Sequence, residues 1–148
     1  MIVDYLMAEQ AIIERLRAQL TELRAVYAVA DTATLTEAQQ QTPNAQVFYH
    51  RDVVDSPPGG QRGQGRAQLV HQIFCVVLAV RNVRDVRGGT GARNEAGPIL
   101  TRIIQALAGW KPSEHHDALR RVTPPIAVAY ETGFRYYPLA FDATLVTV

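Results

Sequence analysis

The spacing of apolar residues changes along the chain from a helical pattern near the N-terminus to strand patterns in the middle and at the end. Between residues 6 and 24, large aliphatic side chains recur every three or four positions, which predicts an amphipathic helix. The stretches 25–30 and 45–54 are short and rich in residues that favour strands. In the second stretch, we expect Val47, Phe48 and Tyr49 to point inward.

The longest strand is predicted at residues 67–82, where positions 73–80 are apolar without interruption. A strand that is apolar on both sides is normally covered on both faces. Helices in a two-layer fold cover only one face of the sheet, so something else must cover the second. We expect a neighbouring subunit to do so, and a third layer within the chain is the alternative.

A second helix is predicted between Asn94 and Gly109, where apolar side chains again recur with helical spacing. Asn94 is the expected N-cap, and Pro98 is tolerable in a first turn because the amides there lack helical partners. Gly109 is the expected residue where the chain leaves the helix with a positive φ.

The last third of the chain predicts two further strands. Residues 113–121 form at most a helical turn or two, and residues 126–130 follow two prolines, which is typical of an edge strand. The terminal stretch 139–147 alternates, with Leu139, Phe141, Ala143 and Leu145 facing inward. This order predicts an α+β fold in a single domain, residues 1–148. The predicted architecture is a two-layer sandwich, with two long helices on one face of a mixed or antiparallel sheet of about five strands.

The composition is that of a globular chain, with 148 residues, 47% hydrophobic and 20% charged. No run approaches the roughly 18 apolar residues that a membrane-spanning helix needs. The first residues also lack the pattern of a signal peptide. The single cysteine, Cys75, lies in the apolar run and is expected to be a buried, inert thiol.

Charge is unevenly distributed along the chain. Residues 1–50 hold three arginines and six acidic residues, a balance of −3, whereas residues 51–93 hold seven arginines and three acidic residues, a balance of +4. Five of these arginines lie in two polar, glycine-rich connections at 55–66 and 83–93: Arg62, Arg66, Arg84, Arg87 and Arg93. They could contact phosphates or acidic residues of a partner, and ordinary solvated loop charge is the alternative.

Other candidate sites are weak. The stretch Gly88-Gly89-Thr90-Gly91 lacks the ending of a nucleotide-binding loop. Adjacent His115 and His116 would point about 100° apart on a helix and lack a third ligand. His50 and His71 lie in strands expected to pair, and Ser56 and Ser113 have no nucleophile elbow around them. We therefore predict no catalytic residues, no cofactor and no metal site.

Several stretches of the chain resemble the tail terminator (tail completion) proteins of long-tailed bacteriophages, including those of phage lambda and prophage relatives. The resemblance lies in the N-terminal amphipathic helix, the overall length, and the helix end Leu107-Ala108-Gly109-Trp110-Lys111-Pro112. It extends to the start of the last strand, Gly133-Phe134-Arg135-Tyr136-Tyr137-Pro138-Leu139-Ala140-Phe141.

The resemblance implies a non-enzymatic virion protein that forms a hexameric ring. The ring would cap the tail tube protein at full length, meet the head-neck connector protein and let DNA pass through its bore, with no role for a membrane. It would assemble in the host bacterial cytoplasm and remain at the tail-head junction of the virion. The five loop arginines would then be docking residues.

The sequence is also compatible with three other functions. A nucleic-acid-binding module using the arginine loops would bind duplex in a strongly salt-dependent way. A small hydrolase or transferase would need a pocket of convergent polar groups, for which the sequence offers no recognisable spacing. Another neck or tail component of a phage, or of a phage-derived secretion machine, is the closest alternative.

Overall fold

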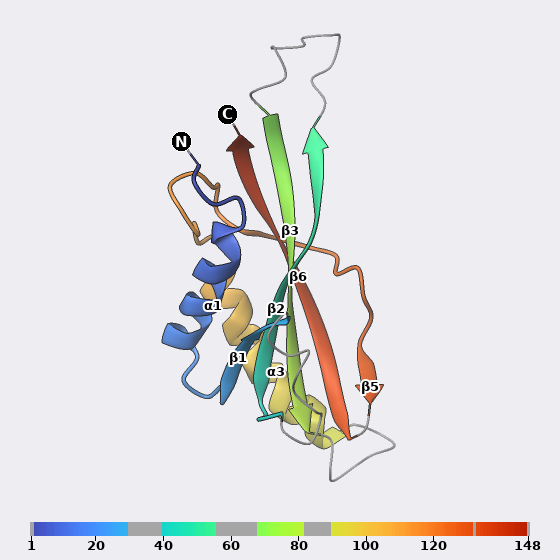
Figure 1. Ribbon diagram of the computed structural model, residues 1–148. Helices are drawn as coiled ribbons and strands as arrows, with labels where there is room; N and C mark the ends of the chain where they lie inside the picture. Colours follow the sequence, from blue (N-terminus) through green and yellow to red (C-terminus); the bar gives the residue numbers. More distant parts are fainter. Residues whose placement is uncertain (1, 30–39, 56–67, 82–89, 132, 148) are drawn as a thin grey trace.

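The computed structural model describes residues 2–29, 40–55, 68–81, 90–131 and 133–147 (Figure 1). The elements are α1 (Met7–Gln19), β1 (Ala25–Ala28), β2 (Asn44–Asp55), β3 (Gln68–Arg81), α3 (Thr90–Leu107), β4 (Arg120–Val122), β5 (Ala129–Glu131) and β6 (Phe134–Thr147). The predicted α+β class is confirmed, because one open, mixed sheet carries two helices. The sheet has six strands where about five were expected.

The sheet is built around β3, which pairs antiparallel with β2 on one side and β6 on the other. Its strand order is β1-β2-β3-β6-β4, with β1 parallel to β2, and β5 also pairs with β6. Figure 1 shows the tips of β2, β3 and β6 continuing past both helices. We call these tips the arm, defined as residues 51–55, 68–73 and 142–147.

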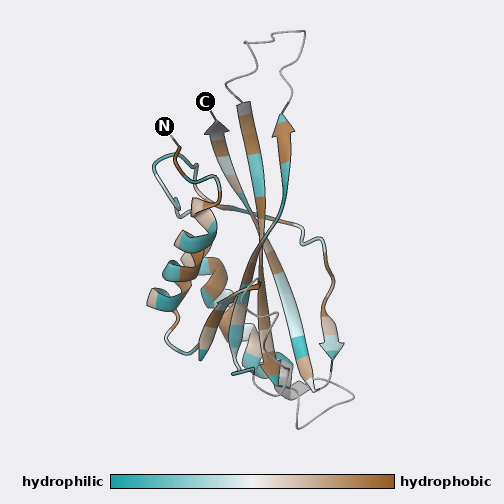
Figure 2. Ribbon diagram, viewed as in Figure 1, coloured by the Kyte–Doolittle hydropathy of each residue, from teal (hydrophilic) through white to brown (hydrophobic). Residues whose placement is uncertain are grey.

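Both helices pack on one side of the sheet, which we call the inner face. Their buried side chains are Ala8, Ile12, Ile13 and Leu16 from α1, and Ala96, Ile99, Ile103, Ala106 and Leu107 from α3. Opposite them lie the inner-face residues Val47, Phe74, Val76, Leu78, Leu139 and Phe141. Figure 2 shows hydrophobic residues concentrated along the middle of β3 and along α3. Each fully buried large side chain stabilises the fold by roughly 1.5–3 kcal/mol before entropy is counted.

The first helix is shorter than its apolar pattern predicted. It ends at Gln19, and the buried residues Leu20 and Leu23 follow in turns that lead the chain into β1. Leu6, the first aliphatic residue of the predicted amphipathic helix, is 41% exposed and lies before the helix begins. The apolar spacing therefore continued past the helix end because the following turns also contribute to the core.

The second helix begins at Thr90, ahead of Asn94, its predicted N-cap. Asn94 is consequently not an N-cap, and Pro98 lies inside the helix and not in its first turn. Because proline has no amide hydrogen, the helix lacks one backbone hydrogen bond there. The predicted end is confirmed, since Gly109 has a φ of 82° and follows the last helical residue closely.

The strands show one wrong side-chain assignment and one missed element. Phe48 does not point inward, because side chains alternate along a strand and Val47 occupies the inner face beside it. The stretch 113–121 forms no helix, and its last residues enter β4, which was not predicted. The sequence Arg-Arg-Val of β4 has no strand pattern and forms a strand only by pairing with β6. The inward alternation of β6 is confirmed.

Candidate assembly surfaces

The middle of β3 is sealed on both faces within one chain, which corrects the expectation that a neighbouring subunit must cover it. On the outer face, away from the helices, Cys75 and Ala79 are fully buried and Val77 is 6% exposed. These side chains are small, and neighbouring strands flank them: Phe48 and Ala140 pair with Cys75 on either side. The apolar run of β3 therefore gives no evidence for assembly by itself.

A segment that we call the strap, residues 123–131, leads from β4 into β5 and lines a groove on the outer face. The groove has a volume of about 460 Å³, and its walls include Phe48, Val77 and Pro138. Three apolar side chains of the strap remain between 42% and 52% exposed: Ile126, Val128 and Tyr130. Exposed apolar side chains gathered on one segment are typical of protein interaction sites.

A second hollow of about 260 Å³ lies on the outer face at the base of the arm. It is lined by His50, Arg51, Val53, Ile73, Val122, Thr123 and Pro125. The register of β2 and β3 shifts at His50, so the residue opposite His71 is Val53. The two strands pair as expected, but their histidines are not cross-strand partners.

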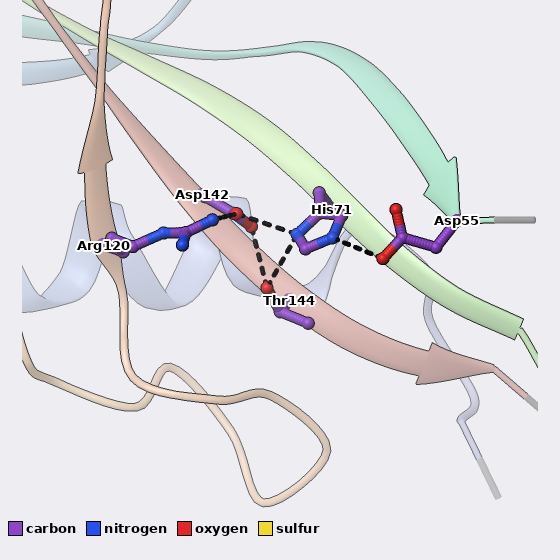
Figure 3. Close-up of polar contacts among 5 residues, drawn as sticks. All are labelled: Asp55, His71, Arg120, Asp142 and Thr144. Carbon is purple, nitrogen blue, oxygen red and sulfur yellow. Dashed lines mark hydrogen bonds and ion pairs between the residues drawn. The ribbon is translucent and has the colours of Figure 1, made fainter.

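Charged side chains form a cluster on the outer face of the arm, which we call the outer-face ionic cluster (Figure 3). His71 Nδ1 lies 2.8 Å from Asp142 Oδ2, and His71 Nε2 lies 3.0 Å from Asp55 Oδ2. Asp142 also accepts hydrogen bonds from Arg120 at 2.7 Å and from the Thr144 hydroxyl at 3.0 Å. Hydrogen bonds to Asp55 and to Asp142 raise the pKa of His71 despite partial desolvation. No spacing in the sequence indicated this cluster.

A second histidine, His116, lies buried on the inner face of the arm. Its Nε2 is 3.1 Å from the Gln72 amide oxygen, which can only accept, so Nε2 carries the hydrogen. The Ser113 hydroxyl, 2.7 Å away, then donates to Nδ1. Burial lowers the pKa of His116, so the imidazole is neutral at pH 7 and fastens the 113–117 turn to β3. Adjacent His115 instead contacts Glu114.

The five predicted docking arginines fall mostly outside the structure. Arg62, Arg66, Arg84 and Arg87 lie outside the described residues, whereas Arg93 is exposed in the first turns of α3 and not in a loop.

Cys75 is buried as expected, and burial raises its pKa to about 11, so the thiol is protonated at neutral pH.

Within the ranges described above, no group of three or more His, Cys, Asp or Glu side chains is arranged to hold a metal ion. In the same ranges, neither helix is both long and apolar enough to span a membrane.

Two helices thus lie on one face of an open mixed sheet, and the strap leaves apolar side chains exposed on the other face. The family model for phage tail terminator proteins matches residues 2–147, so the chain belongs to that family. The fold resembles a chain in the virion of the native gene transfer agent (GTA) particle, with a TM-score of 0.56 and 16% identity. That match covers 97% of this chain and 99% of the other. No curated protein sequence matches.

Membership in this family establishes a structural role in a phage-type tail, in association with other virion tail components. It confirms the resemblance noted in the sequence. The family is one of structural phage proteins, and the similarity to the GTA chain concerns the fold alone.

Proposed function

We propose that the chain, folded as a single domain, assembles into a hexameric ring that caps the completed tail tube and joins it to the head. The family match over residues 2–147 carries this proposal. The apolar side chains that stay exposed on the strap and on the arm support it, because a ring neighbour or the tube could bury them. A repeated head-to-tail contact of this kind closes into a ring when the rotation between copies permits.

The ring has two partners in this proposal. The tail tube protein contacts one side, the head-neck connector protein contacts the other, and DNA passes through the bore. Assembly takes place in the cytoplasm of the host bacterium, and the ring then stays at the tail-head junction of the virion. The mechanism is association between surfaces and involves no chemical reaction.

The docking role of the arginines belongs to the same proposal. Residues 51–93 carry a balance of +4, and Arg62, Arg66, Arg84, Arg87 and Arg93 account for most of their arginines. Guanidinium groups form paired hydrogen bonds with carboxylates, which suits them to acidic surfaces of the tube or connector. Truncating rim arginines of this type mainly slows association and changes its salt dependence.

Tail tubes polymerised with and without the purified chain, and then imaged by electron microscopy, test the proposal. We expect ring-shaped density at one end of the tubes and a uniform tube length only when the chain is present. Replacing all five arginines by alanine should reduce the capped fraction about tenfold or more at physiological salt.

The matched control is Arg24→Ala, which removes an exposed arginine of the N-terminal part of the chain. If the variant that lacks the five arginines caps tubes as often as the wild type, these arginines are not docking residues. Tubes that never carry the chain at either end would remove the capping function itself.

A further inference from the structure

We propose that the outer-face ionic cluster is a pH-dependent latch that holds the tip of β2 against β3 while the imidazole of His71 is protonated. The latch is independent of ring assembly. Its contacts lie within one chain, so it operates whether or not the chain forms a ring.

The geometry around His71 requires two donated hydrogen bonds. Both ring nitrogens face carboxylate oxygens, of Asp142 at 2.8 Å and of Asp55 at 3.0 Å. An ionised carboxylate only accepts hydrogen bonds, and only the imidazolium form of histidine carries hydrogen on both nitrogens. His71 therefore acts as a cation between two anions (Figure 3).

The cluster connects four strands side by side. Asp55 is the last residue of β2, His71 lies in β3, Asp142 lies in β6 and Arg120 lies in β4. The side chain of Asp142 is only 3% exposed, whereas that of Asp55 is 52% exposed. The buried carboxylate thus has three donors, and the exposed one depends on His71 alone among the described residues.

Loss of the proton would open the link to Asp55 first. A neutral imidazole has one N–H, and Asp142 retains it because its carboxylate is only 3% exposed and water cannot readily replace one of its three donors. The lone pair of Nε2 would then face the Asp55 carboxylate, which can turn into water. The tip of β2 would lose its side-chain attachment to β3.

The charged groups around His71 set the direction of the pH dependence. Asp55 faces it from β2 and Asp142 from β6, while Arg120 of β4 reaches it through Asp142. Arg51 lies further along the same face of β2. The pKa of His71 is raised above its ordinary value of 6.5. The latch therefore contributes its full stabilisation below about pH 6.5, and this stabilisation is lost as the pH rises through the raised pKa.

Amide hydrogen exchange of the full chain, corrected for intrinsic rates, tests the latch between about pH 6 and about pH 9. We expect protection of residues 53–55 to fall about tenfold across this range in the wild type. In Asp55→Asn, whose side chain is half exposed and should not be needed for folding, the lower protection should already be present at low pH.

The matched control is His50→Gln. His50 lies in β2 outside the cluster, so this variant should keep the wild-type pH dependence. Unchanged protection of residues 53–55 across the pH range in the wild type would overturn the latch. So would the same pH dependence in Asp55→Asn as in the wild type.

Discussion

Replacing Ile103 by aspartate should unfold the chain. Ile103 is fully buried where α3 packs on the inner face of the sheet. The change removes a side chain whose truncation costs about 2–5 kcal/mol and buries a carboxylate without a partner, which adds several kcal/mol. Since domains of this size are stable by about 5–15 kcal/mol, the sum approaches or exceeds the total. Circular dichroism should show no cooperative melting transition.

The control for this variant is Gln105→Asp, which places the same charge on the exposed side of the same helix. It should melt within a few degrees of the wild type, because exposed substitutions usually change stability by about 0.5 kcal/mol or less. Near-neutral melting of Ile103→Asp would mean that the inner side of α3 has been assigned wrongly.

Replacing Phe141 by alanine should destabilise the chain by about 3–5 kcal/mol. Phe141 is fully buried on the inner face of β6 and lies opposite Phe74 of β3, which is also fully buried. Phe74 cannot move freely into the resulting void, because it is held against Tyr49 in an edge-to-face contact. Urea denaturation should report a lower midpoint with an unchanged slope.

Phe48→Ala provides the comparison for the opposite face of the sheet. Phe48 is the same residue type in a long strand, but it is only partly buried and lines the outer-face groove. Its truncation should cost about 1–2 kcal/mol. Equal losses for Phe48 and Phe141 would contradict a main hydrophobic core between the helices and the inner face.

The elements with strong periodicity were predictable from the sequence, and those formed by distant contacts were not. The inward residues of β6 follow from an apolar residue at every second position, and the buried side of α3 follows from apolar residues at every third or fourth position. The start of α3 was misplaced because Thr90 to Arg93 adjoin a run of glycines, a composition typical of loops. β4 escaped prediction because its strand character comes only from pairing with β6.

The candidate surfaces were predictable only in part. The spacing of Ser113 and His116 is local, and the capacity of serine to bond a histidine three positions on could have suggested their contact. The cluster of Asp55, His71 and Asp142 joins residues that are up to 87 positions apart in the sequence (55 to 142). Only the pairing register of β2, β3 and β6 brings these side chains together. The apolar run of β3 led to a wrong prediction of a subunit contact, because neighbouring strands within one chain bury small side chains such as Ala79.

The mass of the purified chain in solution, measured by light scattering after size exclusion, tests most directly whether copies of it form the proposed ring. We expect a species of six times the 16.4 kDa chain mass at micromolar concentration, with a ring-shaped outline in the electron microscope. A strict monomer at every concentration, on its own and in the presence of tail tubes, would contradict the account.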